Sequence, residues 1–219
     1  MSEYLFLLPI AAALLLGAMS PGPSFILVSQ VAMSQSRAAA ITTSLGMATG
    51  AATFGLLASA GLYIILESVP MVYTALKIVG GLYLCFLAYK IWITAKQPLV
   101  IKVASTQHTG KQPTHAQQIT TKDRLRLLTI GLLTQLSNPK TAIVFASIFV
   151  AFLPEQLPNY AYILLIMVAF LMDFSWYLVV SLVLSTHTAQ QGYAKYKCYF
   201  DRAASSFMGL MGIKLLYNH

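Results

Sequence analysis

Two proline-containing segments decide how this chain folds. The peptide SPGPS occupies residues 20–24, and the peptide SNPKT occupies residues 137–141. Each lies inside a long apolar stretch, and a proline within a helix lacks the backbone N–H and displaces a carbonyl one turn earlier. We therefore expect a helix break at each segment. When Ser20 is aligned with Ser137, the two segments and the apolar residues that follow them coincide, which indicates an internal repeat.

The composition around these segments is that of a membrane protein. Of the 219 residues, 58% are hydrophobic and only 9% are charged, against about 25% charged in an ordinary soluble domain. A soluble fold needs polar surface to cover its core, so a soluble enzyme, a nucleic-acid-binding domain and a disordered regulator are excluded. Cys85 and Cys198 have no short spacing, which argues against a zinc ribbon, a redox motif or a disulfide framework.

Six segments are long and apolar enough, or nearly so, to cross about 30 Å of hydrocarbon as helices. They are residues 4–33, 39–66, 70–93, 127–153, 159–185 and 203–217. The first follows Glu3 instead of a lysine or arginine, so we interpret it as a retained span and not as a cleaved signal peptide. The predicted fold class is an all-α integral membrane protein with six transmembrane helices.

The signs of the charges between the spans predict the orientation. Lysines and arginines lie in the first, third and fifth connections, whereas Glu3, Glu67 and Glu155 lie on the opposite side. An excess of Lys and Arg marks the cytoplasmic side, so we expect both the N-terminus and the C-terminus outside. This placement explains the net charge of +8 without nucleic acid, and the same charges can contact anionic lipid.

The chain divides into two halves of three spans. Residues 1–93 form the first repeat, residues 94–126 a basic cytoplasmic linker, and residues 127–219 the second repeat. Because three is an odd number, the two halves enter the membrane from opposite sides, an inverted-topology arrangement typical of secondary transporters. His108 and His115, both in the linker, are weak evidence for a metal site.

Both helix breaks are predicted near the middle of the bilayer. Unpaired backbone at that depth is costly unless it lines a cavity or a polar site. We therefore expect the two breaks to form the walls of a central substrate site. The alternative is a pair of ordinary proline kinks.

Asp173 lies near the middle of the fifth span, where a carboxylate costs about 2.5–3.5 kcal/mol. Lys140 lies at a similar depth on the fourth span and is its expected partner. Three roles are open: the two residues hold the amine and carboxylate of a zwitterion, Asp173 carries a proton, or the two form a structural ion pair. Trp176 shares the face of Asp173 and is placed to shape a pocket. Gly46 and Gly50, four residues apart on the second span, predict close helix packing.

The candidate substrate-binding or coupling residues lie at the two breaks or beside the intramembrane carboxylate. They are Ser20, Pro21, Gly22, Pro23, Ser24, Ser137, Asn138, Pro139, Lys140, Thr141, Asp173 and Trp176. We predict no catalytic residue, no bound metal and no cofactor.

Three stretches resemble the lysine exporter (LysE/RhtB) family of bacterial amino-acid efflux proteins: residues 17–23 with the glycine-rich second span, residues 136–141, and the ending from residue 201. The resemblance covers essentially the whole chain. It implies export of amino acids such as lysine, arginine, threonine or homoserine across the bacterial inner membrane, driven by an ion gradient. The residues that match its motifs are Pro21, Gly22, Pro23, Asn138, Pro139 and Lys140.

The leading hypothesis is a secondary exporter of neutral, hydroxylated or basic amino acids, coupled to H⁺ or Na⁺ and working by alternating access. The presence of a single acidic residue in the spans favours a neutral or zwitterionic substrate. The alternative is an exporter of divalent metals or of other small solutes. A metal exporter should show His, Cys or clustered carboxylates in the spans. A thiol–disulfide electron carrier would need a cysteine near each break. A homodimer is plausible for a bundle of six short spans.

Overall fold

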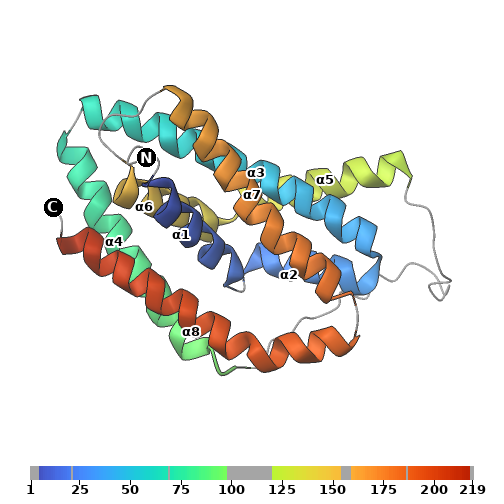
Figure 1. Cartoon of the computed structure of the whole chain (residues 1–219). Helices are drawn as coiled ribbons and strands as arrows, with labels where there is room; N and C mark the ends of the chain where they lie inside the picture. The colour runs from blue at the N-terminus through green and yellow to red at the C-terminus, as the bar shows by residue number, and fades with distance from the viewer. Residues whose placement is uncertain are drawn as a thin grey trace.

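The structure is a computed structural model that describes residues 5–20, 22–68, 70–97, 120–153, 159–185 and 187–217. Within these ranges every regular element is an α-helix (Figure 1). The eight helices are α1 (Leu7–Met19), α2 (Pro23–Ser34), α3 (Arg37–Ser68), α4 (Pro70–Thr94), α5 (Thr121–Leu136), α6 (Pro139–Phe152), α7 (Asn159–Val183) and α8 (His187–Tyr217). The predictions that concern Glu3, Pro21, His108, His115 and Glu155 lie outside the described residues.

The helix breaks at both proline-containing segments, as their sequences predict. The first helix ends at Met19, and α2 starts at Pro23 and is bent by 59° from α1. In the second half, α5 ends at Leu136 and α6 begins at Pro139. Proline suits the first position of a helix, where its missing N–H would have had no intrahelical partner. The fourth expected span is therefore two helices and not one.

Glycines allow two close helix crossings. A Cβ on Gly46 of α3 would overlap the backbone of Leu128 in α5, and a Cβ on Gly131 of α5 would overlap the backbone of Thr43 in α3. The close packing predicted for Gly46 is thus confirmed. At the crossing of α4 and α8, a Cβ on Gly212 would lie 2.8 Å from the carbonyl oxygen of Gly81.

Two apolar clusters fill the interior on either side of the first break. One gathers around α1 and α6 and includes Ile10, Phe149 and Leu165. The other gathers around α2 and includes Phe25 and Met47. Three polar residues at the breaks, Ser20, Ser24 and Asn138, are buried between these apolar clusters.

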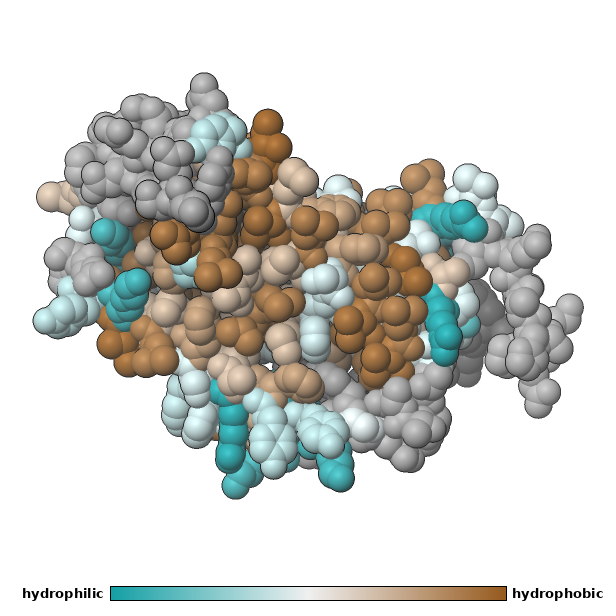
Figure 2. All heavy atoms as spheres, viewed as in Figure 1, coloured by the Kyte–Doolittle hydropathy of each residue, from teal (hydrophilic) through white to brown (hydrophobic). Residues whose placement is uncertain are grey.

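Helix length and composition identify an integral membrane protein. Among the residues that the structure describes, three segments are long and apolar enough to cross a membrane: Arg37–Gly61, Thr74–Thr94 and Tyr160–Val183. The bent pair α1 and α2 makes a fourth candidate, and α6 is apolar but short. Figure 2 shows apolar side chains across the middle of the visible face and hydrophilic ones near its margins. Large apolar side chains on the surface, such as Phe86 and Leu210, are what contact with lipid requires.

The last helix differs from the expected span. The sequence predicts a span over residues 203–217, but α8 begins at His187 and is 31 residues long. Its N-terminal half includes charged residues, among them Lys197 and Asp201, which pair within the helix at 2.7 Å. That pairing lets a polar sequence continue as helix where hydropathy alone predicts a connecting loop.

Candidate functional site

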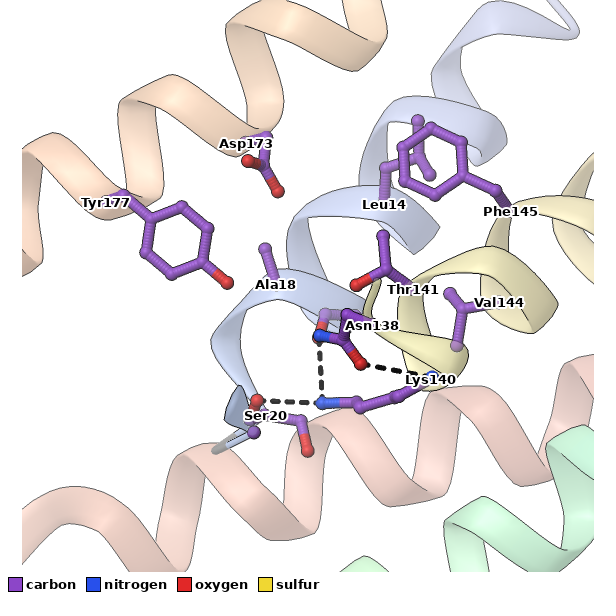
Figure 3. Close-up of a pocket in the computed structure, with 12 residues that line it drawn as sticks. Leu14, Ala18, Ser20, Asn138, Lys140, Thr141, Val144, Phe145, Asp173 and Tyr177 are labelled. Carbon is purple, nitrogen blue, oxygen red and sulfur yellow. Dashed lines mark hydrogen bonds between the residues drawn. The ribbon is translucent and has the colours of Figure 1, made fainter. Parts of the chain in front are cut away.

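A small cavity lies where the α1–α2 break, the start of α6 and the middle of α7 meet (Figure 3). Its volume is about 20 Å³, compared with the roughly 10–15 Å³ that a single water requires. The cavity therefore holds about one water and is closed to an amino acid in this conformation. Residues from three parts of the chain line it: Leu14, Gly17, Ala18, Ser20, Gly22, Asn138, Lys140, Thr141, Val144, Phe145, Asp173 and Tyr177.

The structure gathers part of the predicted set at this cavity. The predicted residues that line it are Ser20, Gly22, Asn138, Lys140, Thr141 and Asp173. Ser24 is buried next to them and bonds to Asn138 at 3.0 Å. Pro23, Ser137 and Pro139 are exposed and do not line the cavity.

Trp176 is placed differently from the expectation. Its ring packs edge-on against Phe200 of α8, with 6.2 Å between the ring centroids, and it does not line the cavity. Tyr177, the next residue along α7, lines the cavity instead, and its side chain points toward Ser20 and Ala18 in Figure 3. A shift of one residue rotates the side chain by about 100° around a helix, so Trp176 faces α8 while Tyr177 faces the cavity.

Asp173 is buried, and one of its two carboxylate oxygens accepts a hydrogen bond from a glutamine side chain. Gln135 donates from Nε2 to Oδ1 of Asp173 at 3.1 Å. In turn, Gln135 accepts at Oε1 from the hydroxyl of Ser24 at 2.6 Å. The other oxygen of Asp173, Oδ2, is buried and has no hydrogen-bond partner within the described residues. The carboxylate thus has one oxygen fixed by the protein and one available for a cationic ligand.

The expected pair between Lys140 and Asp173 is not formed. Lys140 donates from Nζ to the carbonyl oxygens of Ser20, at 2.8 Å, and Gly17, at 3.4 Å (Figure 3). These carbonyls lie at the end of α1, the negative end of the helix dipole, which attracts a cation. Because Gln135 supplies the hydrogen bond to Asp173, the carboxylate does not depend on Lys140 for a partner.

Two buried polar residues near the site were not predicted. Gln135 is 1% exposed and joins Ser24 to Asp173. Asp201 is also 1% exposed and pairs with Lys197, and it is close enough to Lys140 for mutual attraction. The sequence signals were a glutamine one helical turn before Asn138, and a lysine and an aspartate four residues apart.

Metal ligation has little support in the described part of the chain. No group of three or more His, Cys, Asp or Glu side chains lies close enough there to hold a metal ion. The polar groups around the cavity are instead a carboxylate, amides, hydroxyls and an ammonium, which are the groups that bind organic zwitterions.

These features define the class: an all-α integral membrane protein with a buried polar cavity at the junction of broken helices. The sequence profile of the LysE type translocators matches residues 15–219, and the chain belongs to that family. The resemblance seen in the sequence is confirmed, and the protein is a transporter and not an enzyme.

Individual relatives extend over nearly the whole chain. A threonine efflux protein of Escherichia coli (strain K12) is 29% identical over 209 residues, which cover 95% of this chain and 96% of the relative. A threonine efflux protein of Salmonella typhi is 32% identical over 200 residues, covering 90% and 91%. An uncharacterized membrane protein of Haemophilus influenzae is 31% identical over 204 residues, covering 93% and 92%. No solved structure matches the chain significantly.

Proposed function

We propose that this protein is a secondary active exporter of amino acids, which it moves out of the cytoplasm by ion-coupled alternating access. The observation that carries the proposal is Oδ2 of Asp173, which is buried at a closed cavity between the two helix breaks and has no hydrogen-bond partner among the residues that the structure describes. A buried carboxylate oxygen with no partner is costly, and a cationic group of a substrate or a proton would remove that cost. The relatives named threonine efflux proteins favour a small hydroxylated amino acid as the cargo.

The two ends of an amino acid fit different parts of this site. Its ammonium group would bind Oδ2 of Asp173. Its carboxylate would face the N-terminal ends of α2 and α6, whose capping residues Gly22 and Asn138 both line the cavity. A helix N-terminus carries partial positive charge and binds anions, and broken helices use it for this purpose in transporters.

The cavity must enlarge to accept this cargo. At about 20 Å³ it represents a closed state between the two access states. Lys140, which joins α6 to the end of α1 through Ser20 and Gly17, would release these carbonyls when α1 and α6 separate. The site would then open to one side of the membrane.

The proposed architecture has six spans in two inverted halves, with α1–α2 and α5–α6 each counted as one broken span. The helix packing supports this repeat, because α1 packs on α7 as α5 packs on α3, and α2 packs on α7 as α6 packs on α3. The repeat also matches α3 with α7 and α4 with α8. In each of these pairs the two matched helices pack against each other. We propose that both termini lie outside, because an excess of lysine and arginine marks the cytoplasmic side.

Efflux from preloaded cells and uptake into proteoliposomes test the proposal. We expect the wild-type protein to move labelled threonine faster than empty vesicles, and Asp173→Asn to lower that rate to the level of empty vesicles. The matched control is Ser175→Ala, an exposed residue on the same helix whose hydroxyl bonds only locally. It should transport like the wild type.

The same vesicles distinguish the substrate class and the ion. Imposing a pH gradient or a sodium gradient separately identifies the coupling ion. If no basic, hydroxylated or branched amino acid moves faster than in empty vesicles, the proposal of amino-acid export is wrong. Transport of cadmium or nickel by such vesicles would instead support the metal exporter.

A further inference from the structure

A continuous chain of hydrogen-bonded side chains joins both helix breaks to Asp173. Asn138 caps α6 and donates to Ser24 at 3.0 Å, and Ser24, in the first turn of α2, donates to Gln135 at 2.6 Å. Gln135, in the last turn of α5, donates to Asp173 in the middle of α7 at 3.1 Å. All four side chains are at most 6% exposed. This hydrogen-bonded chain therefore connects four helices in a region shielded from bulk solvent.

The α6 cap fixes the direction of every bond in this chain. The backbone N–H of Lys140 donates to Oδ1 of Asn138 at 3.1 Å, so the amide nitrogen of Asn138 faces Ser24. A hydroxyl has one proton, and Ser24, having accepted from Asn138, gives that proton to Gln135. The NH₂ group of Gln135 must then face Asp173, whose Oδ1 must be an acceptor.

A change at Asp173 would disturb the chain as far as the helix junction. If Asp173 turned Oδ1 away when Oδ2 took up a proton or the cationic group of a substrate, the NH₂ group of Gln135 would lose its acceptor. Rotation of the amide would direct that group at Ser24, which already accepts from Asn138. The Ser24 hydroxyl would then face two donors and would need a new acceptor for its own proton. Unsatisfied buried groups of this kind are costly, so the contact between α2 and α6 senses the state of the carboxylate.

We propose that Gln135 is a positioning residue that directs the free oxygen of Asp173 to the cargo and couples the state of this carboxylate to the junction of the two broken helices. The inference rests on the proposed function, because it explains how ion coupling is linked to opening of the site. It assigns a role to Gln135 and Ser24 that differs from cargo binding, since Gln135 does not line the cavity.

The first experiment measures the link without transport. Infrared difference spectra of the purified protein between acidic and neutral pH should contain a carbonyl band of protonated Asp173, identified by its loss in Asp173→Asn. Gln135→Met keeps the length of the side chain but removes the donor, and it should shift this band. The control Thr134→Val changes the neighbouring residue of α5, which has no part in the chain, and should leave the band in place. An unshifted band in Gln135→Met overturns the inference.

The second experiment separates coupling from folding. In proteoliposomes, Gln135→Met should lower gradient-driven accumulation of threonine about tenfold, since a hydrogen bond to a charged group is lost. Threonine exchange in the absence of a gradient should fall by a clearly smaller factor. A purely structural role of Gln135 would lower both rates by the same factor, and that result contradicts the proposal. Ser24→Ala interrupts the next link and should show the same selective loss if Gln135→Met does not fold.

The failures are distinguishable. If the wild-type protein moves no amino acid, the proposed function fails, and the infrared result still decides whether Gln135 controls Asp173. If the wild type transports threonine but Gln135→Met remains fully coupled, only the inference about Gln135 fails.

Discussion

Replacing Gly131 with alanine should force α5 away from α3 and disturb the site one turn further along α5. A Cβ at this position would overlap the carbonyl oxygen of Thr43 and lie 3.1 Å from the backbone nitrogen of Met47. Both contacts are backbone atoms within α3, so neither can move aside as the end of a flexible side chain would. The helices themselves must separate.

The expected size of the effect follows from two opposed terms. Alanine is favoured over glycine within a helix by about 1 kcal/mol, whereas overpacking costs about 1–3 kcal/mol. Because the overlap is with backbone, the cost should be near its upper limit, and the net loss should be about 1–2 kcal/mol. Gln135 lies four residues further on the same face of α5, so a shift of about half an ångström would stretch its 3.1 Å bond to Asp173 beyond hydrogen-bonding range.

Unfolding of the purified protein in detergent, together with threonine transport in proteoliposomes, measures both consequences. The matched control is Gly61→Ala in α3, because a Cβ at that glycine would meet no described atom within 4 Å. The control should be as stable as the wild type or slightly more stable, and it should transport normally. If Gly131→Ala is as stable as Gly61→Ala, then α3 and α5 do not cross this closely in the folded protein, and the prediction is refuted.

Three further predictions concern charged and capping residues. Lys140→Met removes the contacts of the ammonium with the carbonyls at the end of α1, and threonine transport should fall at least tenfold, about the value of one charged hydrogen bond; transport at the wild-type rate would contradict this role. Asp201→Asn leaves the buried Lys197 without its anion and should lower the free energy of unfolding by about 3–5 kcal/mol. In the same unfolding assay, the double variant with Lys197→Met should recover most of this loss. If stability is not recovered, loss of the ion pair is not the cause. Hydrogen bonds from Thr120 hold the pKa of Asp123 below its usual range, so the capping box stabilises the start of α5 above about pH 4 and loses this contribution as the pH falls through the lowered pKa. The protection factors of the amides in the first turn of α5, which are exchange rates corrected for the intrinsic effect of pH, should therefore fall at low pH in the wild type. Equal protection factors at both pH values would refute the prediction.

The breaks in the helices could be predicted because proline acts locally. The missing N–H of Pro139 and the steric demand of its ring depend on no distant residue, so position alone indicates where α6 must begin. The close crossing at Gly46 was predictable for the same reason, since absence of a side chain is itself the feature that permits contact. The extent of α8 was not predictable from hydropathy, because hydropathy does not detect a polar helix, and the pair between Lys197 and Asp201 stabilises one turn of that polar part.

The partners of the charged groups could not be predicted from depth. Lys140 and Asp173 were expected to pair because they occupy similar levels on adjacent spans, but depth does not fix the direction in which a side chain leaves its helix. The break after Met19 leaves carbonyl oxygens that attract the ammonium of Lys140. The carboxylate of Asp173 accepts a hydrogen bond from Gln135 instead. Gln135 is uncharged, so the sequence does not single it out. Its role as the partner of Asp173 becomes visible only in the packed structure.

The small volume of the closed cavity has a consequence for the energy of the cell. A space of about 20 Å³ admits neither a hydrated sodium ion nor a file of water molecules along which protons could hop. In the proposed transport cycle this closed site would not leak ions, and the electrochemical gradient that would drive export would not be dissipated through it while the carrier waits for cargo.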